Sequence, residues 1–224
     1  MARDMYGAMT GPSAWMMTSV WDGTHLLLLW TMWATMMAAM MVPSAWPMLS
    51  MYAKLSRREG SARQSSHHFY LFLAGYVSVW AMFSVTATVV QRVLAEALLL
   101  SPMMEMTSPV ASATFLVIAG VYQWTPFKRL CLASCRSPIS FLLGRWRPGG
   151  MGAFRMGIDH GVYCLGCCWA LMLLLFVGGV MNLYVIAALT ILVVVEKTMR
   201  AGEWGSRLSG GLLIALAVWI LARR

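Results

Sequence analysis

The chain has 224 residues, of which 60% are hydrophobic and only 11% are charged. A soluble globular domain carries roughly 25% charged residues, so this composition indicates an integral membrane protein. The formal net charge of +9 does not indicate nucleic acid binding, because the lysines and arginines stand in short segments between apolar runs, as topology signals do in membrane proteins.

The apolar segments predict an all-α fold, a polytopic bundle of about six transmembrane helices, with five as the alternative count. The first span is expected over about residues 26–49, where Pro43 and Pro47 would kink or end it. The second is expected over about residues 69–90. The third, about residues 109–124, ends at Thr125-Pro126, where Thr125 can cap a new helix and Pro126 can take its first position.

The remaining spans are expected at about residues 161–181, 183–195 and 208–222, with Asn182 between the first two. Several spans are below the roughly 20 residues that cross a bilayer core, so they must recruit flanking residues, stop short or pack inside a larger assembly. We expect one membrane domain over residues 1–224. Its basic, cysteine-containing loop, residues 125–160, would carry short helices at the membrane surface.

Basic residues predict the orientation of these spans. They follow the first span (Lys54, Arg57, Arg58 and Arg63) and the third (Lys128, Arg129, Arg136, Arg145, Arg147 and Arg155). The positive-inside rule places both loops in the cytoplasm. Both termini would then lie outside, although the terminal pair Arg223-Arg224 argues mildly against this.

One segment puts three thiols and an imidazole at the start of the fourth span, His160-Gly-Val-Tyr-Cys-Leu-Gly-Cys-Cys-Trp169. At 3.6 residues per turn, His160, Cys164 and Cys167 share one helix face and Cys168 lies beside them. A histidine near the thiols favours a soft metal more than cysteines alone would. The alternative is structural, because free cysteine is often buried as a small hydrophobe.

Two further cysteines stand in the basic loop. Cys131 and Cys135 are spaced i, i+4 on the short helix that Thr125-Pro126 would start, and they approach the other thiols if this helix folds back against the foot of the fourth span. Four ligands would make a closed tetrahedral zinc site, whereas two or three thiolates suit copper(I). The motif Cys164-x-x-Cys167 also leaves thiol redox chemistry open.

Methionine is the second unusual feature, with 21 residues in the chain. Met32, Met36 and Met40 recur every four residues in the first span and so line one face, with Met37 and Met41 adjoining it. Thioethers bind copper(I) and not hard cations, so these residues are possible additional ligands. A methionine stripe also serves as adaptable packing, and the small alanines between the methionines favour that alternative.

Charged residues inside the spans are nearly absent. Glu196-Lys197 ends the fifth span, where it either marks the membrane interface or forms a functional site, since an acid near bilayer depth is a functional candidate by default. No nucleophilic triad, phosphate-binding loop or paired acidic motif is convincing, so we assign no catalytic residues.

The run from Tyr122 to Pro138, the motif from His160 to Trp169 with Met181-Asn182, and the methionine-rich pattern from Met32 to Pro43 resemble a bacterial family described as predicted metal-binding integral membrane proteins, a domain family of unknown function. The resemblance covers most of the chain. It implies a metal-binding protein in the bacterial inner (cytoplasmic) membrane. It brings no established reaction.

We therefore expect a protein that binds a soft transition metal, most directly copper(I) with zinc as the alternative, for metal handling or delivery to a membrane metalloenzyme. The expected ligands are His160, Cys164, Cys167, Cys168, Cys131 and Cys135. The competing hypothesis is a non-catalytic accessory subunit that packs against other membrane chains. The expected partners are membrane lipid and either other membrane subunits or a metalloenzyme, with no nucleic acid.

Overall fold

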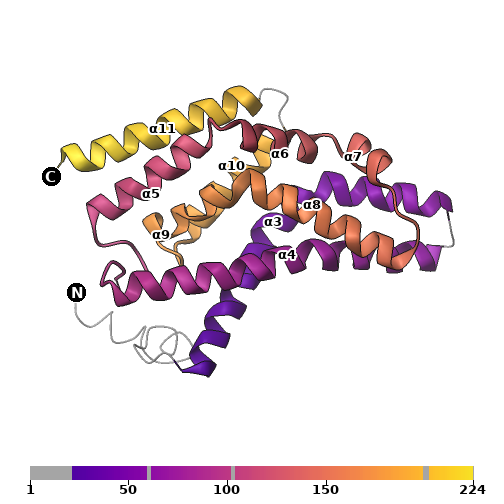
Figure 1. Cartoon of the computed structure of the whole chain (residues 1–224), viewed down its shortest axis with the longest axis horizontal. Coiled ribbons are helices and arrows are strands. Elements are labelled where there is room, and N and C mark those ends of the chain that lie inside the picture. Colours follow the sequence, from indigo (N-terminus) through magenta and orange to yellow (C-terminus); the bar gives the residue numbers. More distant parts are fainter. Residues whose placement is uncertain (1–21, 60–61, 102–103, 199–201, 224) are drawn as a thin grey trace.

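The computed structural model describes residues 22–59, 62–101, 104–198 and 202–223, and it confirms the all-α fold. Apart from an isolated bridge between Leu100 and Met106, the regular structure in these ranges is helical. Arg224, named above as a topology signal, lies outside the described residues. The helices are α3 (Gly23–Glu59), α4 (Ala62–Glu96), α5 (Pro109–Tyr122), α6 (Pro126–Arg136), α7 (Pro138–Arg145), α8 (Gly149–Met172), α9 (Leu174–Gly178), α10 (Leu183–Thr198) and α11 (Gly202–Ala222) (Figure 1).

Four helical stretches are long and apolar enough to cross a membrane: Gly23–Arg57, Arg63–Glu96, Gly149–Gly178 and Trp204–Ala222. A fifth arises if α5 and α6, which are bent by 65° at the break between them, count as one span. The expected fifth span, about residues 183–195, lies in α10, which has only 16 residues. In the described part of the chain the count is therefore four or five.

α8 begins at Gly149, well before the expected start of the fourth span near residue 161. Gly149 has a φ of +78°, which glycine adopts without strain and which turns the chain into the helix after Pro148. The last part of the expected loop is thus helical. His160 and Cys164 lie inside α8 rather than at its first turn.

α3 continues through Pro43 and Pro47 to Glu59, so the prolines do not end it. Figure 1 shows that α3 changes direction between its two halves, which agrees with the alternative expectation of a kink. Near the prolines, the carbonyl oxygen of Met41 accepts hydrogen bonds from the hydroxyls of Ser44 (2.8 Å) and Tyr76 (3.0 Å). The bond from Tyr76 ties this part of α3 to α4.

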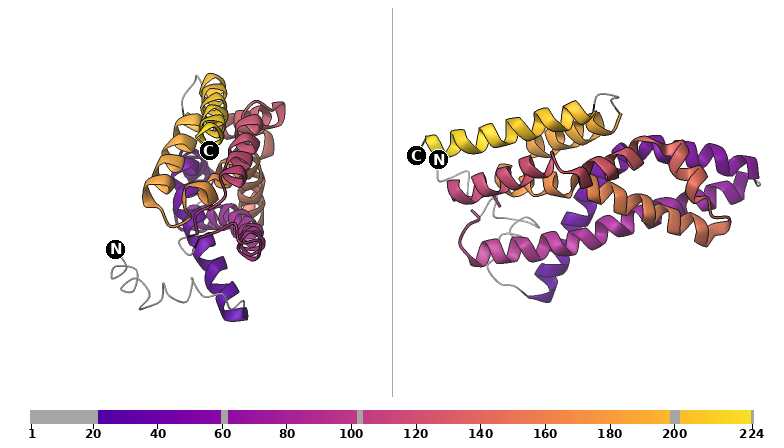
Figure 2. Two further views of the ribbon diagram at one scale, coloured as in Figure 1. Left: turned by 90° about the vertical axis from the view of Figure 1, so that its left-hand side faces the viewer. Right: turned by 45° about the horizontal axis from the view of Figure 1, so that its top comes forward.

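The break between α5 and α6 has the chemistry expected of Thr125-Pro126. The Thr125 hydroxyl accepts a hydrogen bond from the Lys128 amide at 3.3 Å, and Pro126 occupies the first turn of α6. These residues start a new helix in a new direction. α6 then packs against α8, and the right-hand view of Figure 2 shows the two helices side by side.

α4 and α8 approach each other closely because both carry glycine at their contact. A methyl group at Gly75 would overlap the carbonyl oxygen of Phe154, and one at Gly157 would overlap that of Phe72. Small residues allow such backbone contact between helices in membranes. The close approach sets Tyr76 of α4, which is fully buried, against the cysteine-bearing face of α8.

Candidate metal centre

Sulfur atoms from three helices meet in the interior. Cys164, Cys167 and Cys168 come from α8, Cys135 comes from α6 and Met41 comes from the bent part of α3. The Sγ atoms of Cys135 and Cys167 are 4.0 Å apart, and the Sγ of Cys168 lies 4.0 Å from the Sδ of Met41. We refer to these five residues as the sulfur cluster.

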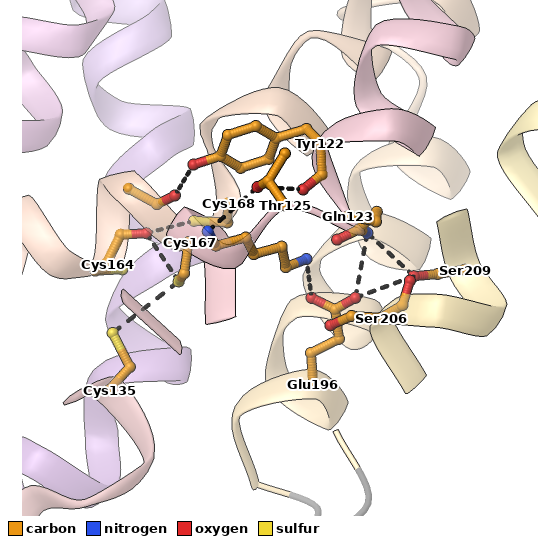
Figure 3. Close-up of polar contacts among 12 residues, drawn as sticks. Tyr122, Gln123, Thr125, Cys135, Cys164, Cys167, Cys168, Glu196, Ser206 and Ser209 are labelled. Carbon is orange, nitrogen blue, oxygen red and sulfur yellow. Dashed lines mark hydrogen bonds and ion pairs between the residues drawn. The ribbon is translucent and has the colours of Figure 1, made fainter. Parts of the chain in front are cut away.

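Within α8, two thiols turn back toward the preceding turn. Cys167 Sγ donates to the carbonyl oxygen of Cys164 at 3.0 Å, and Cys168 Sγ donates to the same oxygen at 2.9 Å. Long helical side chains prefer this direction toward the N-terminal turn. Figure 3 shows the consequence: Cys167 faces Cys135 across the gap between α8 and α6.

Cys164 has polar partners from two other helices. Its Sγ lies 3.0 Å from the Tyr76 hydroxyl and 2.9 Å from Lys197 Nζ. Lys197 also donates to the hydroxyl of Ser44 at 2.8 Å. All four side chains are buried. A charge at this depth is costly unless it is paired, and the ammonium group of Lys197 lies where it would stabilise a thiolate on Cys164.

His160 is buried among aromatic rings. Its ring stacks on Tyr76, with centroids 5.6 Å apart and planes 26° apart, and meets the edge of Phe141 at 5.5 Å. Its Nδ1 atom is buried and has no hydrogen-bond partner in the described structure. Its described ring contacts are therefore aromatic, and its role as a ligand stays a prediction.

Cys131, the other loop cysteine, faces α8 one turn before Cys135. A Cβ atom added to Gly166 would lie 2.7 Å from the Cys131 sulfur, so this thiol packs against the bare backbone of α8. The oxygen of Gly166 also accepts a hydrogen bond from the Tyr122 hydroxyl. The helix of the loop and the thiol-bearing helix thus meet, which the sequence had left as a condition.

The methionines predicted as possible ligands have different surroundings. Met40 is buried, whereas Met32 and Met36 are half-buried and pack against the core. Met41, which the sequence placed only beside the stripe, is the methionine of described α3 whose thioether contacts a thiol, that of Cys168. The spacing of the methionines did not reveal this, because the contact depends on how α3 meets α8.

A buried ion pair holds α6 in place. Lys128 Nζ lies 2.7 Å from a carboxylate oxygen of Glu196, and the two side chains are 1% and 4% exposed. Gln123 and Ser209 donate to the other oxygen at 3.2 and 3.1 Å, and Arg136 donates to the Glu196 carbonyl at 2.9 Å. Figure 3 shows this network beside the thiols. Glu196 and Lys197 thus serve neighbouring sites from one end of α10.

No group of three or more His, Cys, Asp and Glu side chains that could hold a metal ion occurs in the part of the chain that the structure describes. The geometry does offer a pair of thiols, Cys135 and Cys167, with Cys164, Cys168 and Met41 adjoining. All five cysteines of the chain are free thiols. Sequence reasoning did not predict three contacts of this site: Tyr76 with Cys164, Ser44 with Lys197, and Met41 with Cys168.

Comparison with known proteins identifies the family. A family model, PpoB2, described as "Copper chaperone", matches residues 30–220. The match includes all five cysteines, the buried lysines Lys128 and Lys197 and the bent part of α3. Neither the curated proteins nor the solved structures gave a match. The chain therefore belongs to the PpoB2 copper chaperone family.

Proposed function

We propose that this protein is an integral membrane copper chaperone that carries Cu(I) in the sulfur cluster and passes it to a membrane metalloenzyme. The family supports copper handling, and four or five helices of sufficient length and apolarity support membrane integration. The observation that carries the site is the 4.0 Å separation of the Cys135 and Cys167 sulfurs. Copper is the cargo of this protein, and we assign no catalytic residue.

The separation of the two thiols suits one metal ion between them. Two sulfurs bound to one metal at about 2.3 Å lie about 3.8 Å apart in a tetrahedral arrangement and about 4.6 Å apart in a linear one. The Cys135 and Cys167 sulfurs, at 4.0 Å, are within this range. Both can bind an ion without a change in the position of the helices.

The chemistry of the neighbouring groups favours Cu(I) over zinc. Thiolates and thioethers are soft donors that select Cu(I), and the Met41 thioether lies next to Cys168. Zinc is a borderline ion that is commonly bound by four cysteine, histidine or carboxylate groups. A Cu(I) ion between two thiolates leaves one net negative charge, which the ammonium of Lys197, 2.9 Å from Cys164, balances inside the protein.

The position of the thiols is also consistent with release of the ion. Cys135 lies on α6, which is only 11 residues long and is less buried than α8. Movement of Cys135 away from Cys167 would leave the ion bound to one thiolate of the pair. A partner protein with competing thiolates or thioethers then takes the metal, which is how we expect delivery to a metalloenzyme to occur.

Copper loading of the purified full chain in detergent tests the proposal. The parent protein is reduced, loaded with Cu(I) without oxygen and challenged with a coloured Cu(I) chelator. We expect Cys135→Ser and Cys167→Ser to lose most of the retained copper. The matched control is Cys131→Ser, which removes a thiol from the same helix and should retain most of it.

Equal copper retention by the parent protein and both serine variants would contradict the site. Elemental analysis of the same samples for zinc separates the two metals. A parent protein that retains neither metal would favour the accessory-subunit hypothesis instead.

A further inference from the structure

A cavity lies where the C-terminal end of α5 meets the first turns of α11. Its volume is about 460 Å³, and Gln123, Trp124, Arg129, Ser206 and Arg207 line it. It is separate from the sulfur cluster, because none of its lining residues belongs to that cluster. Copper handling gives it no role.

The cavity has a rigid wall. α5 and α11 touch through glycines, since a Cβ added to Gly120 would lie 2.9 Å from the Gly210 oxygen, and one added to Gly210 would lie 2.8 Å from the Gly120 oxygen. The indole of Trp124 donates to the carbonyl of Arg207 at 3.1 Å. These contacts fix the two helix ends, and with them the residues of the cavity, in one arrangement.

Two buried polar groups in the wall have no partner. The hydroxyl of Ser206 and the side-chain oxygen of Gln123 are buried, each residue is 2% exposed, and neither atom makes a hydrogen bond in the described structure. A buried polar group without a partner costs about 1–3 kcal/mol. A ligand that meets these groups would remove this cost.

The charges around the cavity favour an anion. Arg129 and Arg207 both line it, and no salt bridge joins either guanidinium to a carboxylate among the described side chains. Among the described side chains, the acid that contacts Gln123 is Glu196, which Lys128 neutralises at 2.7 Å. Guanidinium groups match phosphate oxygens in a bidentate manner, and a serine hydroxyl adds a donor.

We infer that this cavity binds the phosphate group of an anionic phospholipid. The positive-inside rule predicts that this end of α5 and α11 faces the cytoplasm, where basic pockets between transmembrane helices bind lipid headgroups. Trp124, Phe127 and Leu208 are exposed at the same end of the helices and lie beside the acyl chains. The Gln123 oxygen accepts a hydrogen bond from a hydroxyl of the headgroup.

Binding to the delipidated full chain in an uncharged detergent tests this inference. The probes are short-chain phosphatidylglycerol, inorganic phosphate and diacylglycerol, which has no phosphate. We expect phosphatidylglycerol to bind and the double variant Arg129→Gln/Arg207→Gln to raise its Kd by about tenfold or more. Arg155→Gln, which removes an exposed arginine from α8, is the matched control and should leave the Kd unchanged.

Ser206→Ala gives a second, gentler test. The buried hydroxyl has no partner in the described structure, so its loss should not lower the thermal stability and should raise it if anything, while the Kd for phosphatidylglycerol rises several-fold. Tight binding of inorganic phosphate alone would support the phosphate site with a free anion as ligand. Equal binding of phosphatidylglycerol by the parent protein and the double variant would overturn the inference, and so would binding of diacylglycerol as tight as that of phosphatidylglycerol.

Copper retention measured on the same variants should stay at the parent level. The lipid site and the copper site can therefore be tested independently.

Discussion

Lys197 is the positive charge in direct contact with the sulfur cluster. Its Nζ lies 2.9 Å from Cys164 Sγ, inside the protein. Lys197→Leu removes the charge, keeps the side chain apolar and adds no thioether beside the thiols. We expect the variant to fold and to bind Cu(I) about tenfold more weakly or worse, because a charge a few ångströms away contributes more than about 1.4 kcal/mol even when partly screened.

Competition with a Cu(I) chelator measures the affinity of this variant. Lys197→Arg keeps the charge and should retain most of the affinity. Lys54→Leu makes the same change at an exposed position of α3 and should have no effect. Parent-level affinity in Lys197→Leu would show that the ammonium does not balance the charge of the bound ion.

Met41 supplies the thioether of the cluster, with its Sδ 4.0 Å from Cys168 Sγ. Met41→Leu keeps the volume of the side chain, so the cost in stability should stay below about 1.5 kcal/mol. We expect Cu(I) affinity to fall several-fold because the soft donor is lost. Met40→Leu is the control: it changes a buried methionine of the predicted stripe, and its Cu(I) affinity should match that of the parent protein. A larger loss of affinity in Met40→Leu than in Met41→Leu would favour the stripe of Met32, Met36 and Met40 as the source of the thioether ligand. Chelator competition and thermal unfolding give the two quantities.

At the scale of elements, the pair Lys128–Glu196 links α6 to α10 and so holds Cys135 near Cys167. Glu196→Gln leaves the Lys128 ammonium buried without its anion, and we expect a loss of about 3–5 kcal/mol in the free energy of unfolding. Copper retention should fall as well, because α6 loosens. Denaturant unfolding in mixed detergent micelles measures the stability.

The exposed pair Arg92–Glu96, with side chains 46% and 52% exposed, offers a matched control. Glu96→Gln should cost less than about 1 kcal/mol. The double variant Lys128→Met/Glu196→Leu removes both buried charges and should recover much of the stability. If Glu196→Gln were no worse than Glu96→Gln, the buried pair would not be what holds α6.

Local chemistry explains which elements could be predicted. Thr125-Pro126 starts α6 as expected, and the i, i+4 spacing of Cys131 and Cys135 puts both on the face that meets α8. Contacts between distant helices could not be predicted: Lys197 reaches Ser44 across 153 positions of the chain. The helix start at Gly149 was also missed, because a glycine-rich segment reads as a turn until packing against α4 stabilises the helix.

At the scale of the whole molecule, the composition was enough to predict an α-helical membrane protein, but the number of spans depends on packing. α10 is apolar enough to suggest a span, yet it ends in Glu196 and Lys197, which are buried against α6, α8 and α3. A helix of 16 residues reaches about 24 Å, less than a hydrocarbon core of about 30 Å. Other helices must therefore cover the end of α10 that carries Glu196 and Lys197, and these helices supply the partners of both charges.

The distribution of basic residues predicts which end of the bundle faces the cytoplasm, and labelling can test it. Leu98, which is 84% exposed after α4, should lie outside, and Gly144 of α7, where an added Cβ meets nothing within 4 Å, should lie inside. In intact cells a membrane-impermeant maleimide should label Leu98→Cys, and it should label Gly144→Cys only after permeabilisation. The parent protein sets the background from its native thiols. The reverse pattern would put Cys135, on the short helix beside α7, at the outer surface, and copper would then have to be collected from and delivered to the outer side of the membrane.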